Sequence, residues 1–229
     1  MDMVRSGKLD GYSVPVEFFD LKPFVPALVW AAWISMGPNE RRKWNALGAG
    51  LAVTAVVELL AYTLVCFGRE NHWLYNLYLC AQVPLGAWLV RSMSNDAALR
   101  KYAWAGVVVS GGFALWEVLG FGTFRLLFTR LGMLNNMVLA VLFTWLLFEQ
   151  AGRSRPLFAQ APFWLAVAHL MYVGCTLPLT GLLNYLNERN LGLSSRLYVV
   201  HDVVFALFHA VVLVLLLGPF RRPLNHHAP

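Results

Sequence analysis

The stretch YVVHDVVFALFHAVVLVLLL, residues 198–217, decides the fold class of this chain. It is long enough for a helix to cross a hydrocarbon core of about 30 Å, at about 1.5 Å per residue. It contains His201, Asp202 and His209, which cost free energy in lipid, so we expect them to face the inside of a helical bundle. Asp202 and His209 share one helical face, with the small Ala206 between them. The stretch therefore predicts a transmembrane helix whose polar inner face leaves room for a ligand or water.

Earlier apolar runs in the chain follow the same pattern, each with one or a few polar residues. They are residues 23–36, 44–67, 73–90, 99–121, 124–148 and 157–183. Together with residues 198–217 they predict an all-α, polytopic membrane protein, a bundle of seven transmembrane helices. The first run is short and contains Pro26, so a bundle of six helices is the alternative.

The segments outside these runs are short. We interpret residues 1–22 as an N-terminal arm at the membrane interface and residues 23–219 as the transmembrane domain. Residues 220–229 then form a short polar C-terminal tail. Residues 184–195 are rich in polar side chains and are predicted to be the longest internal loop.

Composition supports the membrane interpretation, since 59% of the residues are hydrophobic and 13% are charged, against about 25% charged in soluble domains. The net charge of +6 does not point to nucleic acid, because the basic residues stand at the ends of apolar runs and form no basic face. The odd number of cysteines, Cys66, Cys80 and Cys175, all in apolar runs, argues against a disulfide framework.

The basic residues also predict an orientation. The connections after the first, third and fifth predicted helices, with their flanks and the tail, hold ten of the 18 Lys and Arg residues: Arg41, Arg42, Lys43, Arg91, Arg100, Lys101, Arg153, Arg155, Arg221 and Arg222. Under the positive-inside rule this side faces the cytoplasm, so we expect the C-terminus inside and the N-terminus outside. The expected location is the plasma membrane or a bacterial inner membrane.

The candidate site consists of polar side chains in the predicted helices. They are Glu58, Tyr62, Gln82, Glu117, His169, Tyr172, His201, Asp202 and His209. A carboxylate at mid-membrane costs about 3 kcal/mol, so Glu58 and Glu117 are expected to be protonated, paired or in contact with water. The functional interpretation is a proton relay, a cation site or an anchor for a ligand. The structural interpretation is a hydrogen bond between helices, which contributes roughly 1 kcal/mol.

Three familiar cofactor sites are disfavoured by the same residues. His201 and His209 are about 12 Å apart along a helix, too far to bind one zinc ion, so no metal site is predicted. Microbial rhodopsins carry their retinal lysine four residues after an aspartate at the position of Asp202, but this chain has Ala206 there and no lysine in any predicted helix, which excludes a retinal Schiff base. Single histidines such as His169 on separate helices are weak support for a haem, and we expect none.

These observations predict a receptor-like or transport protein that binds a small ligand, ion or proton in a polar central cavity. It would move that ligand or sense it through a protein partner or a second copy of the chain. The alternative is an intramembrane enzyme acting on a lipid or another apolar substrate, with His201 and Asp202 as an acid–base pair. A third interpretation is an accessory membrane subunit whose polar groups join helices. The sequence favours binding or transport over catalysis.

Overall fold

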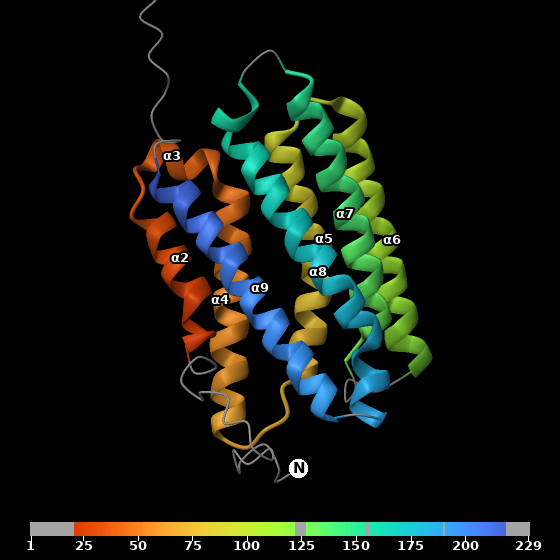
Figure 1. Cartoon of the computed structure of the whole chain (residues 1–229). Helices are drawn as coiled ribbons and strands as arrows, with labels where there is room; N and C mark the ends of the chain where they lie inside the picture. The colour runs from red at the N-terminus through yellow and green to blue at the C-terminus, as the bar shows by residue number, and fades with distance from the viewer. Residues whose placement is uncertain (1–20, 122–126, 154–155, 190, 219–229) are drawn as a thin grey trace, which may run out of the picture.

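The structure, a computed structural model, describes residues 21–121, 127–153, 156–189 and 191–218. Within these ranges the chain is helical and contains no strand (Figure 1). The elements are α2 (Phe24–Ile34), α3 (Pro38–Lys43), α4 (Asn45–Cys66), α5 (His72–Met93), α6 (Ala97–Phe121), α7 (Thr129–Ala151), the 3₁₀ turn η2 (Leu157–Ala159), α8 (Ala161–Arg189) and α9 (Leu191–Leu217). The predicted tail, and the predicted arm apart from residues 21 and 22, lie outside the described residues.

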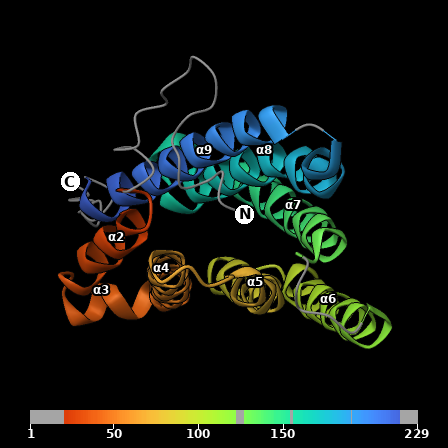
Figure 2. The same ribbon diagram turned by 90° about the horizontal axis from the view of Figure 1, so that it is seen from below.

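The long helices form a ring, with one helix outside it. Helix α2 packs against α4, α4 against α5, α5 against α7, α7 against α8, and α8 against α9, which returns to α2. Helix α6 lies outside this ring, against α5 and α7. Seen along the bundle, α4, α5 and α6 form one row, and α9, α8 and α7 form a second row (Figure 2). The ring encloses the space in which most of the predicted polar residues lie.

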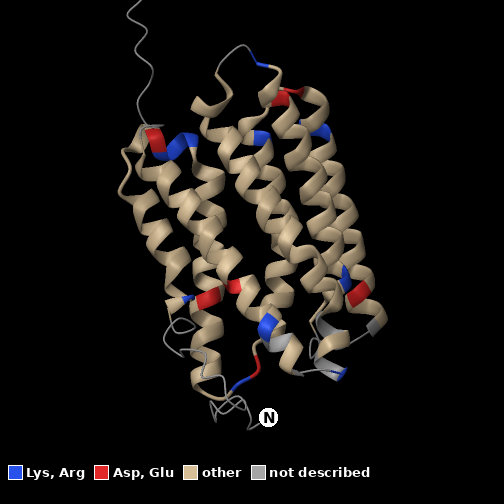
Figure 3. Ribbon diagram, in the orientation of Figure 1, with Lys and Arg blue, Asp and Glu red and all other residues tan. Residues whose placement is uncertain are grey.

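The chain is a helical, multi-pass membrane protein. Among the described residues, five helices are long and apolar enough to cross a membrane, namely α4, α6, α7, α8 and α9. Helix α2 has 11 residues and is about 16 Å long, roughly half of the hydrocarbon core. Helix α5 is long enough to cross the membrane but is less apolar, because it carries residues such as Asn76 and Gln82. It is enclosed by α4, α6 and α7. The charged residues lie mostly at the two ends of the bundle (Figure 3).

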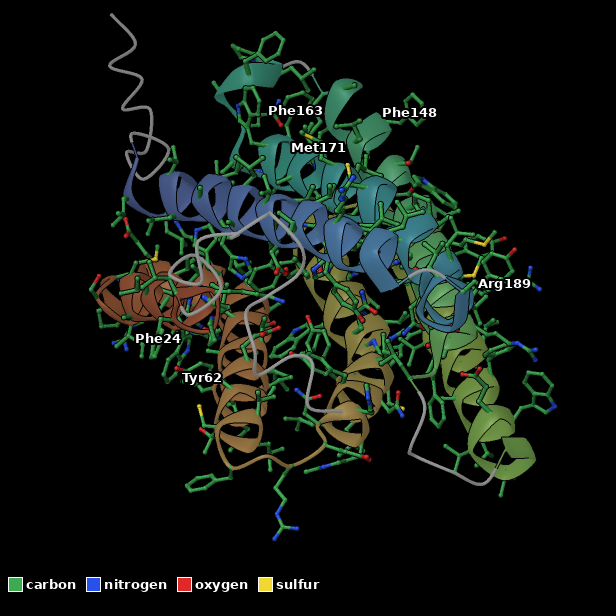
Figure 4. The ribbon with its side chains drawn as sticks, turned by 60° about the horizontal axis from the view of Figure 1, so that its bottom comes forward. Phe24, Tyr62, Phe148, Phe163, Met171 and Arg189 are labelled. Carbon is green, nitrogen blue, oxygen red and sulfur yellow. The ribbon has the colours of Figure 1, made fainter. Side chains whose placement is uncertain are left out.

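The outer surface of the bundle is apolar. Val108, Leu119 and Phe148 are more than two-thirds exposed, at 73%, 76% and 71%. Phe148 and Met171 point away from the bundle (Figure 4). Exposed apolar surface of this extent suits contact with lipid, since a water-soluble chain exposes much smaller apolar patches.

Helix α2 is held in the ring by a close approach to α4. A Cβ atom at Gly48 would lie 2.2 Å from Cε2 of Trp33, so the indole ring occupies the space that a side chain would need. Glycine therefore allows the short α2 to contact α4 directly, which completes the ring on that side.

The prediction of a long loop over residues 184–195 is wrong. Helix α8 continues to Arg189 and α9 begins at Leu191. The polar residues of this segment extend both helices beyond their apolar parts: α8 has 29 residues and is about 44 Å long, more than the hydrocarbon core requires. Two predicted helix starts also shift along the chain, because α7 begins at Thr129 and α8 begins at Ala161, after η2.

Candidate functional site

Two neighbouring cavities lie inside the ring, a larger one of about 370 Å³ and a smaller one of about 100 Å³. Tyr78, Gln82, Tyr172 and Phe205 line both cavities. We call these four residues the waist, because the cavities meet there. The two cavities are therefore neighbours on either side of the waist.

The cavities are stacked along the length of the bundle. The larger cavity reaches His72, at the start of α5, and the smaller cavity reaches Ala46, near the start of α4. These two helix starts are at opposite ends of the bundle (Figure 1). The two cavities together thus extend along most of the bundle.

Glu58 is a carboxylate in the wall of the larger cavity. It lies on the buried face of α4, which also carries Leu51, Ala55 and Ala61 at helical spacing. Its exposed fraction is 8%. The hydroxyl of Tyr75 donates a hydrogen bond to Oε2 at 3.3 Å, and no other described side chain donates to the carboxylate. Oε1 is therefore available to a ligand in the cavity.

Lys22 brings a second charged group to the wall of the larger cavity. Nζ of Lys22, just before α2, is 2.8 Å from Oδ1 of Asp202 on α9. His201 Nδ1 lies 3.2 Å from the same oxygen, so its N–H donates to the carboxylate and Nε2 is left as an acceptor. The hydroxyl of Tyr172 lies 3.5 Å from Nε2, within reach to donate to it. Asp202 thus neutralises Lys22 and fixes the orientation of His201.

Amide side chains join the remaining wall of the larger cavity. Gln82 Nε2 donates to Oδ1 of Asn136 at 3.3 Å, and Nδ2 of Asn136 donates to the hydroxyl of Thr176 at 3.4 Å. Asn135 donates to the carbonyl of Leu79 at 2.7 Å and accepts a hydrogen bond from a serine on α6 at 2.6 Å. These hydrogen bonds link α5, α6, α7 and α8, as expected for polar groups in an apolar bundle.

The smaller cavity contains two histidines. Nδ1 of His169 donates to the carbonyl of Leu165, and Nδ1 of His209 donates to the carbonyl of Phe205, both at 2.8 Å. The imidazole of His169 also stacks on Phe143, with ring centroids 4.1 Å apart. Because the Nδ1–H groups are used by the backbone, each Nε2 is an acceptor in a cavity with mostly apolar walls.

The structure brings together most of the predicted site residues. Four of them line the larger cavity: Glu58, Gln82, Tyr172 and His201. Two line the smaller cavity: His169 and His209. Asp202 is bonded to His201 beside the larger cavity, and the remaining two, Tyr62 and Glu117, line neither cavity. Glu58 and His169 therefore line neighbouring cavities, and Asp202 touches the larger one through His201. Ala206 lines neither cavity, and Phe205 occupies the cavity wall between His201 and His209.

Tyr62 and Glu117 have other surroundings. Tyr62 lies beside Phe24 of α2, with ring centroids 6.0 Å apart (Figure 4). Glu117 Oε2 accepts a hydrogen bond at 3.3 Å from the backbone N–H of Leu131, in the first turn of α7. The first N–H groups of a helix have no partner within the helix, so Glu117 stabilises the start of α7.

The sequence analysis left Lys22 and Tyr75 out of the site. Lys22 precedes the first predicted helix, where a lysine is ordinarily a contact to lipid headgroups. The available signal for Tyr75 is its distance of 17 residues from Glu58 across a helical hairpin, which places it on the neighbouring helix. Neither signal identifies the residue as part of the site unless the packing of α2 and α5 is known.

No three His, Cys, Asp or Glu side chains are grouped as metal ligands in the part of the chain that the structure describes. The chain matches no family model, no curated protein and no solved structure. The geometry of the cavities is therefore the basis for a functional proposal.

Proposed function

We propose that the protein binds a small ligand or ion in the larger cavity, either to move it across the membrane or to sense it through a partner. The observation that carries this proposal is the carboxylate of Glu58, which is buried in the wall of a 370 Å³ cavity and has one oxygen without a protein donor among the described residues. Keeping such a group in an apolar bundle costs free energy, and this favours a functional role. The size of the cavity is within the usual range for small-molecule sites, about 300–1,000 Å³.

The position of the smaller cavity favours transport over a closed binding site. It continues from the waist toward the opposite end of the bundle, where its wall includes Ala46 and Leu89. The waist residues separate the cavity that contains Glu58 from one with two histidine acceptors. A ligand or proton that passed the waist would meet His169 and His209 next.

The proposal includes seven spans, with α2 and α5 counted, and the N-terminus outside. In this orientation the larger cavity, with Lys22 and His72 in its wall, is at the external end. A reporter fused after Pro229 should then report the cytoplasm, and one fused at the N-terminus should report the exterior. If both ends report the same side, the seven-span count is wrong, and α2 is the helix to reconsider because of its length.

Access to the cavity can be tested by thiol labelling. The three cysteines are first replaced (Cys66→Ala, Cys80→Ala, Cys175→Ala), and a thiol is then placed in the larger cavity by Thr176→Cys. The matched control is Ser110→Cys, equally buried at 1% against 2%, between α6 and α7 and in neither cavity. Membrane-impermeant methanethiosulfonates, one with a trimethylammonium group and one with a sulfonate, are applied to intact cells.

If the larger cavity is open to the exterior, at least one reagent labels Thr176→Cys and neither labels Ser110→Cys. Equal labelling of both variants would show that the bundle opens without a defined cavity. No labelling of either, from either side of the membrane, would contradict a ligand cavity and favour an accessory subunit whose polar groups join helices.

An intramembrane enzyme is the second candidate, favoured by one observation. His201 donates from Nδ1 to Asp202 and has its Nε2 at the cavity, an arrangement in which an imidazole serves as a general base. An enzyme of this kind should convert a lipid when the purified protein is placed in vesicles of natural membrane lipid, and His201→Gln should abolish the new species seen by mass spectrometry. An unchanged lipid profile with the unmodified protein would reject this candidate.

A further inference from the structure

We propose that the ligand of the larger cavity is a small organic cation, an amine or quaternary ammonium compound with an apolar body. The ammonium group would lie at Oε1 of Glu58, and the apolar body would lie against the aromatic walls. This inference rests on the proposed function, because it names the chemical class that the same cavity would take.

The charges in the cavity favour a cation. Among the described residues that line either cavity, Lys22 and Glu58 are the charged side chains, apart from the histidines. Lys22 is paired with Asp202 at 2.8 Å, and this pair carries no net charge. The carboxylate of Glu58 accepts one hydrogen bond from a neutral hydroxyl and has no ion pair of its own. An ammonium group would supply the missing positive charge.

The walls of the larger cavity favour an organic cation over a simple metal ion. Tyr75, Tyr78, Tyr172 and Phe205 surround the space in front of Glu58 from three different helices. Aromatic rings attract ammonium groups through their π faces and bury apolar bodies at the same time. A cation already uses this wall, since Nζ of Lys22 lies 5.5 Å from the centroid of Phe205.

The size and composition of the cavity narrow the ligand further. At about 30 Å³ per water, 370 Å³ holds roughly a dozen water-sized groups, which suits an amine with one aromatic ring or a short alkyl chain. Among the described residues of this wall, an anion would find no Lys or Arg apart from Lys22, which is paired with Asp202. A metal ion would need several oxygen or nitrogen ligands converging on one point, and the described residues offer no group of three acidic, His or Cys side chains.

The experiment compares three ligands of similar shape and different charge: phenethylamine, 2-phenylethanol and phenylacetate. Binding to the full-length protein in detergent is measured by the shift of its melting temperature and by titration calorimetry, at constant ionic strength set with KCl. Phenethylamine should bind at least tenfold more tightly than 2-phenylethanol, and phenylacetate should not bind. Glu58→Gln should reduce phenethylamine affinity at least tenfold and leave 2-phenylethanol unchanged.

The matched control is Glu117→Gln, which changes a buried carboxylate outside both cavities and should leave phenethylamine affinity unchanged. A second readout needs no added ligand: the trimethylammonium reagent should label Thr176→Cys faster than the sulfonate reagent, relative to a free thiol, and Glu58→Gln should remove the difference.

The outcomes separate this inference from the proposed function. Equal binding of the amine and the alcohol, or equal labelling by both reagents, would retain the cavity and overturn its preference for cations. Preferential binding of phenylacetate would overturn it as well, and so would stabilisation by KCl that matches that by phenethylamine. Failure of all three ligands, together with an unlabelled Thr176→Cys, would overturn both proposals.

Discussion

Glu58 and Glu117 are the same residue type, each in a long apolar helix, and both are buried, with exposed fractions of 8% and 4%. Their surroundings are different. Glu117 accepts a hydrogen bond from the backbone of the next helix, where the N–H group needs a partner. Glu58 accepts a hydrogen bond from the tyrosine hydroxyl at position 75 and faces a cavity. Burial alone therefore does not separate a structural carboxylate from a functional one, whereas the partners and the adjacent space do.

Asp202 provides a third case. It is bonded to a lysine and to a histidine, so its charge is compensated within the protein. It touches the larger cavity through His201 and does not line it. The three carboxylates thus form an order: Asp202 is fully paired, Glu117 stabilises the start of a helix, and Glu58 is available to a ligand. Replacing each of them tests this order, and we expect the loss of stability to decrease along it.

The largest loss is expected for Asp202→Asn. This change leaves the charge of Lys22 without its carboxylate, where its side chain is 20% exposed. A charged hydrogen bond lost in such a place costs about 2 kcal/mol of unfolding free energy, which corresponds to a decrease of roughly 4–8 °C in melting temperature. Melting of the purified protein in detergent, followed by circular dichroism, measures the change.

The double variant Lys22→Met with Asp202→Asn is the control, since it removes both charges and should recover most of the stability. An unchanged melting temperature in Asp202→Asn would show that Lys22 finds another partner, and Glu58 is the described carboxylate that lines the same cavity. That result would contradict the assignment of Glu58 as the uncompensated charge.

A smaller loss is expected for Glu117→Ala. The N–H of Leu131 loses its acceptor at the start of α7, and removing such a group costs about 1 kcal/mol, or roughly 2–4 °C. Glu117→Gln retains a side-chain oxygen that can accept the same hydrogen bond, so most of the stability should remain. Equal losses in the two variants would instead assign the role of Glu117 to its charge. Phenethylamine binding should be unchanged in both.

The approximate positions of most helices could be predicted from the sequence, because six of the seven apolar runs, all except residues 23–36, are long enough to require a helix in lipid. The all-helical class is confirmed, and α4, α6, α7, α8 and α9 are the helices whose length and hydropathy support a span. The ends of α8 and α9 could not be predicted, because polar residues beyond the hydrocarbon core are compatible with both a loop and a helix.

The rotation of each helix about its axis could not be predicted either. On α9 the expected inner face contained Asp202, Ala206 and His209, whereas the cavity wall is formed by His201, Phe205 and His209. These two faces overlap, since neighbouring residues differ by about 100° around a helix. Contacts with α2 and α8 select between them, and those contacts depend on side chains distant in the sequence.

The smallest loss of stability is expected for Glu58→Gln, together with the largest loss of ligand binding. Glutamine has nearly the same shape, and its amide oxygen can accept the hydrogen bond from Tyr75, so the unfolding free energy should change by less than about 0.5 kcal/mol. The negative charge is lost, so phenethylamine affinity should fall at least tenfold while the neutral alcohol binds as before. Melting temperature and titration on the same preparation test both parts. A variant that loses more than about 1 kcal/mol and still binds the amine would place Glu58 with Glu117, as a carboxylate that joins helices.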